Sequence, residues 1–435
     1  MVASVAGLSI SASGCGSLVH HDNAPPAGLV AKATPWAGTF RSNDLPSGIG
    51  AVTSLSCPVP DDCFATASTV GTGVGTNGAT VIATRNGGAT WSLEAVPPTA
   101  GYLSAISCPD ISHCVAAGQS AAALGANGLV FATEDRGRVW TAAPPIPGIT
   151  DVGVVTCLAG GRCLAVGASA SGAVSLVSTT SGSRWQPAAP LPTGTAGATS
   201  VSCAGAGHCW VTGQVALDLD HVAGTVAETA DFGAHWTSVP VPPGTGVLGG
   251  ISCATAGASA SLPYGPAGSG PATAPGAAAV SGSTSGTPTS APGGTPTSTS
   301  SPSPSTTTTV PGVPGYACTA VGSTTTAVGA SRSGRGVILV TGDGGSTWTA
   351  ARVPSSAAAF ATLSCPRAGE CAAVGTTTAA SSASGVAVLT GSGRDPWRKP
   401  AVLEVPQPLT AVSCPARARC VMGGVAVTER LAATS

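Results

Sequence analysis

Charged residues are scarce in this 435-residue chain: Asp, Glu, Lys and Arg together make up 8%, and the net charge is −1. A chain of this kind has no basic field that could hold nucleic acid or an anionic lipid surface, so we expect no nucleic-acid partner. Long apolar runs are also missing, and no stretch reaches the roughly 20 residues that cross a bilayer. We therefore expect contact with a membrane only through a lipid anchor.

Glycine (61 residues) and proline (36 residues) are abundant, and the apolar residues are mostly Ala and Val. This composition is typical of many short strands joined by turns and argues against long helices. The sequence also resembles itself at a period of about fifty residues, which favours one large repeat domain over two or three separate domains.

Fifteen cysteines are too many for a reducing compartment unless they bind metal. Fourteen of them form seven pairs, one pair in each repeat, and structural zinc sites usually have tighter cysteine spacings. We therefore expect seven disulfides and no metal or other cofactor. The expected disulfides are Cys57–Cys63, Cys108–Cys114, Cys157–Cys163, Cys203–Cys209, Cys253–Cys318, Cys365–Cys371 and Cys414–Cys420.

The first repeat, residues 47–98, sets the template for the others. Strands are expected at 52–57, 63–67 and 78–84, and a fourth follows a tight turn at 85–91. Four short strands with turns between them have the size of one propeller blade. The two cysteines of a repeat would then face each other across the hairpin between its first and second strands.

The two ends of the chain complete one repeat. The last repeat contains Cys414 and Cys420 and stops after 425–429, before any strand with a tryptophan, whereas the segment 28–46 has Trp36 but no cysteine pair. We expect the Trp36 segment to be the missing fourth strand. The predicted fold is all-β: a seven-bladed β-propeller with four-stranded antiparallel blades, closed by N- and C-terminal strands in one blade.

The segments outside the repeats have other expected roles. Residues 12–15, Ala-Ser-Gly-Cys, resemble a bacterial lipobox, which implies that Cys15 is acylated after cleavage, although Ala12 stands where that pattern usually has Leu. The alternative is a tail with a stray cysteine. The domains expected are a signal and lipobox segment at 1–15, a tether at 16–27, a propeller at 28–255 and 316–435, and a disordered Ser/Thr/Pro/Gly/Ala-rich insert at 256–315.

A turn with an acidic residue, a glycine and a tryptophan recurs before the fourth strand. Asp135, Asp231 and Asp343 occupy the acidic position, and Asn86 is a near-equivalent. These turns resemble the Asp-box of bacterial neuraminidase repeats, and the whole repeat is similar to propellers of the photosystem II assembly factor type, with the cysteine pair added. The resemblance implies that the Asp caps the turn, that the glycine has a positive φ, and that the tryptophan packs between blades.

Sialidases share Asp-boxes, so hydrolysis has to be considered. The resemblance implies that such an enzyme needs an arginine triad, a Tyr nucleophile with a Glu partner and an acid Asp, but tyrosine occurs only at Tyr102, Tyr264 and Tyr316, and no Tyr–Glu pair is evident. We therefore predict a monomeric, non-catalytic binding or scaffolding propeller outside the cytoplasm, with a protein or glycan partner at the cell envelope. The alternatives are a sialidase-like or other glycoside hydrolase, and an assembly or sensor factor for an envelope protein.

One polar cluster is a candidate ligand site. Asp218, Asp220 and His221 lie between the expected second and third strands of the fourth repeat, on the face opposite the cysteine hairpins. Three such side chains could bind a cation or another ligand, and the alternative is a solvated loop. Tyr102 and Asp151, at the start of two first strands, are expected on the same face as ordinary loop residues.

Overall fold

The computed structural model describes residues 29–34, 39–70, 78–121, 127–205, 207–216, 222–255, 315–324, 335–377, 384–390, 397, 400–416 and 419–424. Strands β1 to β28 lie in these ranges, which contain no helix. A helix long and apolar enough to cross a bilayer is accordingly not found among the described residues. The expected signal segment and tether, and all of the expected insert except Gly315, lie outside them.

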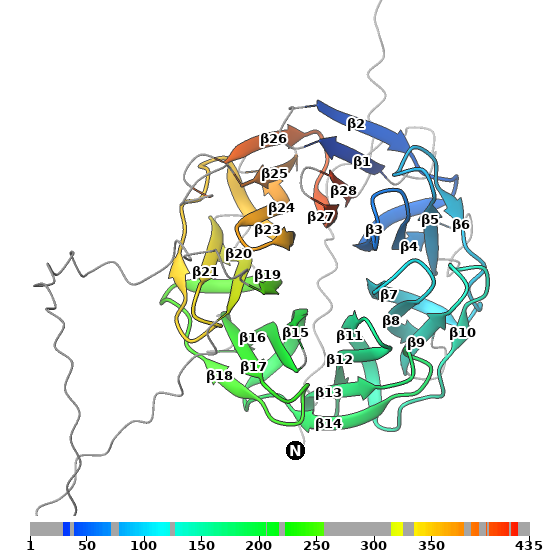
Figure 1. Cartoon of the computed structure of the whole chain (residues 1–435), viewed down its shortest axis with the longest axis horizontal. Helices are drawn as coiled ribbons and strands as arrows, with labels where there is room; N and C mark the ends of the chain where they lie inside the picture. The colour runs from blue at the N-terminus through cyan, green and yellow to red at the C-terminus, as the bar shows by residue number, and fades with distance from the viewer. Residues whose placement is uncertain are drawn as a thin grey trace, which may run out of the picture.

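The strands form seven four-stranded antiparallel sheets, which Figure 1 shows arranged in a ring. The first three sheets after the N-terminal strands are β3(Ile49–Ser56), β4(Cys63–Thr69), β5(Ala79–Thr84), β6(Ser92–Leu93); β7(Ala100–Ser107), β8(Cys114–Ser120), β9(Gly128–Thr133), β10(Thr141–Ala142); and β11(Ile149–Leu158), β12(Arg162–Ser169), β13(Gly172–Ser178), β14(Gln186–Pro190). The next three are β15(Thr195–Ala204), β16(His208–Ala216), β17(Val222–Thr229), β18(Thr237–Val239); β19(Thr245–Thr255), β20(Tyr316–Thr324), β21(Gly336–Thr341), β22(Thr349–Ala350); and β23(Ala357–Arg367), β24(Glu370–Thr377), β25(Gly385–Leu389), β26(Ala401–Val405).

The remaining sheet joins the two ends of the chain and is called the closing sheet. It consists of β2(Thr39–Asp44), β1(Leu29–Thr34), β28(Arg419–Gly424) and β27(Leu409–Ala416), in that order. The chain ends thus share one sheet and the ring has no free edge between its first and last members.

The expected division of strands in the closing sheet is wrong. One N-terminal strand and three C-terminal strands were predicted, but each end supplies two. The segment 28–46 was taken as one strand, although Pro35 and Gly38 lie in its middle. Proline cannot donate to a strand ladder, and both residues favour turns, so the segment divides into β1 and β2. Trp36 and the expected strand at 425–429 lie outside the described residues.

All seven expected disulfides are present, one in each sheet. Each disulfide lies across the hairpin between the innermost strand of its sheet and the strand next to it. Cys157 is paired directly with Cys163, for example, with 4.1 Å between their Cα atoms. Seven disulfides fit an oxidising, extracytoplasmic environment.

The core lies in the wedges between neighbouring sheets. Trp397, of which 0% is exposed, packs with Val321 and Ile338 of the preceding sheet, and Trp140 packs with Phe64 and Val81 in the same way. The tryptophan of a sheet therefore stabilises its contact with the sheet before it, as the resemblance to Asp-box repeats implied.

The turns before the fourth strands are held by a repeated set of hydrogen bonds. The Val139 N–H donates to Asp135 Oδ1 at 2.9 Å, the Thr133 hydroxyl donates to the same oxygen at 2.9 Å, and the Gly137 N–H donates to Thr133 Oγ1 at 3.0 Å. In the third repeat, which has no acidic residue there, the Thr180 hydroxyl accepts from the Arg184 N–H at 3.0 Å. A threonine hydroxyl group can therefore take the place of the carboxylate in this turn.

The glycine in each turn allows two sheets to approach closely. A Cβ atom on Gly137 would lie 2.8 Å from Phe64, and one on Gly233 would lie 2.8 Å from Leu164, each in the preceding sheet. Both glycines have positive φ angles, of 82° and 90°. Trp210, the tryptophan outside the repeated set, occupies the same position as Phe64 and packs against Gly345.

Candidate functional site

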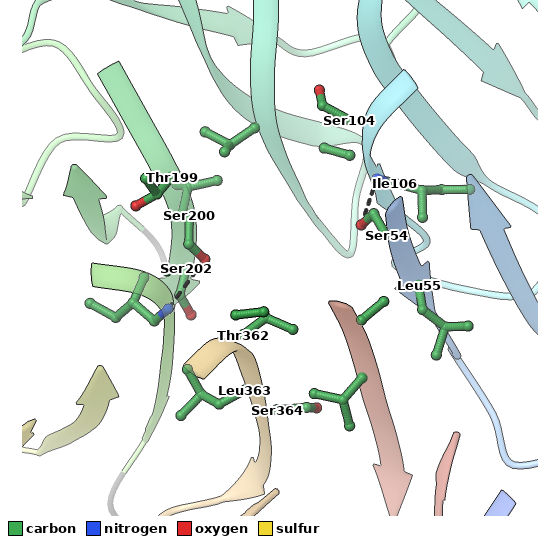
Figure 2. A pocket seen from close by; sticks show the side chains of 18 of the residues that line it. Ser54, Leu55, Ser104, Ile106, Thr199, Ser200, Ser202, Thr362, Leu363 and Ser364 are labelled. Atoms are coloured by element: carbon green, nitrogen blue, oxygen red, sulfur yellow. Dashed lines mark hydrogen bonds between the residues drawn. The ribbon is translucent and has the colours of Figure 1, made fainter. Parts of the chain in front are cut away.

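The central channel forms a cavity of about 370 Å³ at the axis of the ring. Its lining comes from the innermost strand of every sheet, namely β3, β7, β11, β15, β19, β23 and β27. The lining side chains are small or aliphatic, many carry a hydroxyl group, and none of them is ionisable. Figure 2 shows these side chains around the channel.

One ring of hydroxyl groups joins neighbouring sheets. The residue before the first cysteine of a sheet is a serine in six sheets and Thr156 in the seventh. Each of the six serines accepts a hydrogen bond from the backbone N–H of the first cysteine in the next sheet. Six such bonds, of 2.9 to 3.2 Å, are present. One of them links Ser413 of the closing sheet to Cys57, across 356 positions of sequence. The recurrent Ser-Cys dipeptide was visible in the sequence, but its role between sheets was missed.

A second set of hydroxyl groups lies four residues before the first cysteine. Thr53 donates to the Leu103 carbonyl at 2.7 Å, and Ser104 donates to the Val152 carbonyl at 3.1 Å. Thr199 and Thr410 make the same kind of bond to the next sheet. These channel hydroxyls therefore saturate backbone carbonyls and hold the ring together.

Two titratable side chains occur where the first strands begin, two residues before the channel lining. Tyr102 precedes Ser104 in β7, and Asp151 precedes Gly153 in β11. Burial raises the pKa of the Asp151 carboxyl group. Burial also raises the pKa of Tyr102, and the negative charge of Asp151 raises it further. Strands β7 and β11 are neighbours in the ring, so the two groups lie on adjacent first strands, at one mouth of a channel whose lining is uncharged.

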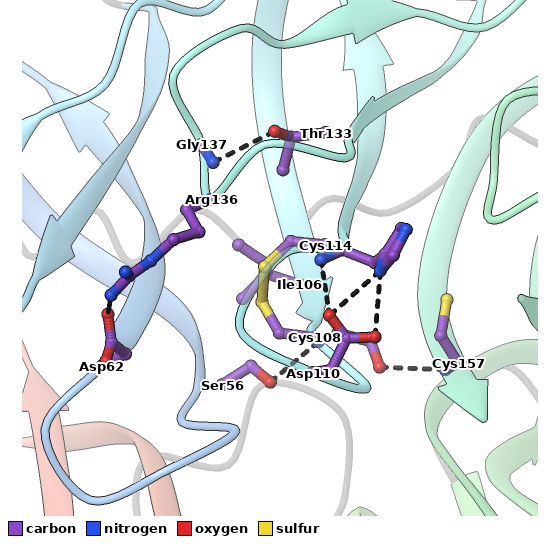
Figure 3. The surroundings of a disulfide bond; sticks show 12 residues. Ser56, Asp62, Ile106, Cys108, Asp110, Cys114, Thr133, Arg136, Gly137 and Cys157 are labelled. Carbon is purple, nitrogen blue, oxygen red and sulfur yellow. Dashed lines mark hydrogen bonds and ion pairs between the residues drawn. A yellow bond between two sulfur atoms is a disulfide. The ribbon is translucent and has the colours of Figure 1, made fainter. Parts of the chain in front are cut away.

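A smaller cavity of about 250 Å³ lies between the β7–β10 sheet and the β11–β14 sheet. Asp110 and His113 line it together with Ser181 and the Cys157–Cys163 disulfide. Burial opposes ionisation of Asp110, but hydrogen bonds from the backbone of His113 and Ser112 and from the His113 side chain lower its pKa. Figure 3 shows Asp110 turned back onto its own loop, beside the Cys108–Cys114 disulfide. This carboxylate is therefore occupied in capping the loop.

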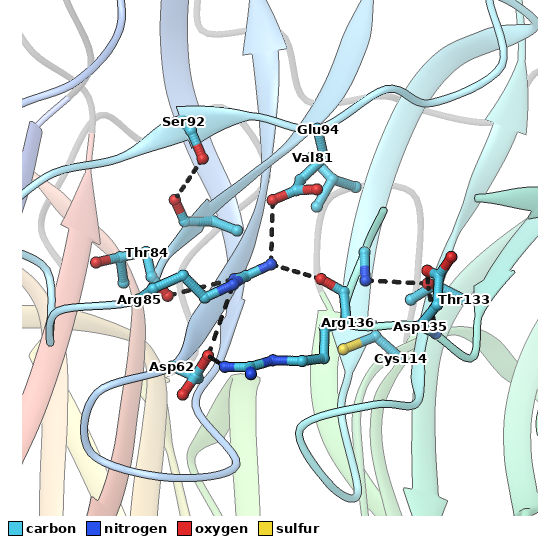
Figure 4. A network of polar contacts seen from close by, with 12 residues as sticks. Asp62, Val81, Thr84, Arg85, Ser92, Glu94, Cys114, Thr133, Asp135 and Arg136 are labelled. Atoms are coloured by element: carbon cyan, nitrogen blue, oxygen red, sulfur yellow. Dashed lines mark hydrogen bonds and ion pairs between the residues drawn. The ribbon is translucent and has the colours of Figure 1, made fainter. Parts of the chain in front are cut away.

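A polar network links the β3–β6 sheet to the β7–β10 sheet (Figure 4). Arg136 contacts Asp62 at 2.7 Å, and Arg85 contacts Asp62 at 3.6 Å and Glu94 at 3.3 Å. Arg85 also donates to the Arg136 carbonyl and lies 4.6 Å from the centre of the Phe64 ring. Both arginines and both acids are thus used in joining the two sheets.

The carboxylates of the turns before the fourth strands are held in their ionised form. Backbone hydrogen bonding from Val139 is the largest cause of the lowered pKa of Asp135. Burial alone would raise the pKa of Asp231, but hydrogen bonds from His235 and Thr229 lower it to about 2. A general acid must carry a proton near the operating pH, so these groups are unsuited to that role.

The residues predicted as a ligand site, Asp218, Asp220 and His221, lie outside the described residues, as does Cys15. They remain predictions. Among the described residues, no group of three or more His, Cys, Asp or Glu side chains could hold a metal ion. Tyr102 and Asp151, which were expected to be ordinary loop residues, lie instead in strands at the channel mouth.

The fold places the chain in the class of disulfide-bonded β-propellers. No family model matches it, and no curated protein does. Among solved structures it is similar to YCF48 bound to a D1 peptide (11% identity, 88% of this chain, 95% of that chain, TM-score 0.47). It is also similar to a GH74 xyloglucanase from Xanthomonas campestris (13% identity, 85% of this chain, 52% of that chain, TM-score 0.47). A third similar structure is the Hadza microbial sialidase Hz136 (12% identity, 87% of this chain, 66% of that chain, TM-score 0.42). At these identities and scores the likeness concerns the fold and carries no argument about activity.

Proposed function

We propose that this protein is a non-catalytic binding module outside the cytoplasm, which holds a protein or glycan partner of the cell envelope. The observation that carries the proposal is the chemistry of the central channel. Every sheet contributes to this channel, and its lining has hydroxyl groups but no ionisable side chain. General acid–base and nucleophilic catalysis need a titratable group at the reacting bond.

The distribution of acids argues in the same direction. Hydrolysis of a glycosidic bond ordinarily needs two carboxyl groups facing one sugar. Asp62 and Glu94 are paired with arginines, Asp110 caps its own loop, and Asp135 caps a turn. These acids serve the fold, so binding is better supported than hydrolysis.

We further propose that the protein is anchored by an acyl chain on Cys15. In cells that express the full-length precursor, Cys15→Ser should move the protein from the membrane fraction to the medium, and labelling by a radioactive fatty acid should be lost. Cys371→Ser, which breaks a structural disulfide, is the control for a general effect of cysteine loss. Retention of label or of membrane association in Cys15→Ser would rule out the anchor.

Binding is tested with the purified protein and isolated cell envelopes of the producing organism. We expect saturable co-sedimentation that is lost after the envelopes are treated with protease, for a protein partner, or with periodate, for a glycan. Released reducing sugar is measured in the same samples and should stay at the background of a boiled sample. Catalytic release of reducing ends would favour a hydrolase, and absence of saturable binding would dismiss the proposal.

A further inference from the structure

We infer that the channel mouth beside Asp151 and Tyr102 binds a positively charged group, an ammonium or guanidinium carried by the protein partner. This inference rests on the proposed function and names the chemistry of the partner. Three features of the mouth carry it: a gap in the hydroxyl ring, a carboxylate without a cation, and an exposed aromatic ring beside it.

The gap that matters lies at Gly153. Gly249 and Ala361 also lack the hydroxyl group, but the residues two positions before them, Val247 and Ala359, are not carboxylates. At the equivalent position, four residues before the first cysteine, Thr53, Ser104 and Thr199 each place a hydroxyl group that bonds to the next sheet. Gly153 has no side chain to do so, and a Cβ atom built there would lie 3.5 Å from Asp151 Oδ2. The Asp151 carboxylate therefore occupies the side of β11 from which the hydroxyl group is missing, directly beside the channel lining.

This carboxylate has no cationic partner among the described residues. Burial raises its pKa, and hydrogen bonding from the Val152 backbone offsets this only in part. Tyr102 occupies the equivalent position on the neighbouring strand β7, and the channel lining carries no charge. A partly buried carboxylate is stabilised by an opposite charge, and an entering ammonium or guanidinium group supplies one.

Tyr102 completes the site. Its side chain is 43% exposed, and it projects from the strand adjacent to that of Asp151 in the ring. In the other five sheets the position six residues before the first cysteine is small or aliphatic; it is Ala51, Gly197, Val247, Ala359 or Pro408. An aromatic face beside a carboxylate binds a cation through the ring quadrupole and a charge-assisted hydrogen bond.

The probe is Nα-acetyl-lysine methylamide, and its matched neutral control is the Nε-acetylated form. The chain has three tyrosines, so the NMR spectrum of a protein labelled with ¹³C in its tyrosine rings has few signals. The signal that is absent in Tyr102→Phe belongs to Tyr102. At constant ionic strength we expect the Tyr102 signal to shift saturably with the probe, and about fivefold to tenfold more weakly with the neutral control.

Asp151→Asn keeps the shape of the side chain and removes its charge, so it should weaken probe binding about fivefold to tenfold. Glu134→Gln, at an exposed turn away from the channel lining, should leave binding unchanged. Equal binding by wild type and Asp151→Asn would overturn the inference, as would a Tyr102 signal that responds to cellobiose and not to the probe.

Envelope binding separates this inference from the proposed function. If wild type and Asp151→Asn bind envelopes equally and the probe shows no dependence on Asp151, the cation site is wrong and the binding module stands. If wild type does not bind envelopes at all, the proposed function fails, and the probe titration still decides whether the mouth binds a cation.

Discussion

Deletion of residues 1–44 is expected to abolish cooperative folding. The deletion removes β1 and β2, half of the closing sheet, and leaves β28 as an open edge. Five register pairs from Leu29–Gly424 to Ala33–Cys420 are lost, together with the hydrogen bond from the Asn43 side chain to the Gly88 carbonyl. The two-stranded remnant of β27 and β28 cannot bury both faces, and two-stranded sheets are marginally stable in water.

The measurement is urea unfolding followed by circular dichroism, on protein with all disulfides formed. Deletion of residues 1–27 is the matched control, because it leaves both strands intact and should not change the unfolding midpoint. Deletion of residues 1–34 removes β1 alone and should be as damaging as the longer deletion, since β2 pairs only through β1. A sharp transition of unchanged midpoint in the 1–44 deletion would show that the ring does not need its N-terminal strands.

The covalent and local features of the fold could be predicted from the sequence, because each repeat carries its own signals. Paired cysteines on either side of a short turn, such as Cys157 and Cys163, indicate a hairpin, and a hairpin brings directly opposed side chains within bridging distance. The turn that contains Asp135 and Gly137 is also local, so its hydrogen bonds follow from residue types alone.

The contacts between repeats could not be predicted in the same way. Whether Ser413 meets Cys57, or Trp210 lies against Gly345, depends on how sheets twist and pack, which no local pattern reports. The candidate site also depends on how the sheets pack. Tyr102 and Asp151 are 49 positions apart in sequence, and only the ring places the starts of their two strands together.

The disulfide that closes the longest loop is expected to contribute most to stability. Cys253 and Cys318 are 65 positions apart, whereas Cys157 and Cys163 are 6 apart. In the chain-entropy model a cross-link restricts the unfolded chain more when its loop is longer, which gives about 4 kcal/mol for the first disulfide and about 2 kcal/mol for the second. Replacing both cysteines of a pair by alanine should lower the free energy of unfolding in urea by these amounts.

Loop length can be separated from local packing by grafting. If residues 254–317 are replaced by the five residues 158–162, the loop between Cys253 and Cys318 becomes as short as that of the Cys157–Cys163 hairpin. In this background the double alanine substitution at 253 and 318 should cost about 2 kcal/mol instead of about 4. An equal cost in both backgrounds would mean that the disulfide acts through contacts in the folded sheet and not through the entropy of the unfolded chain.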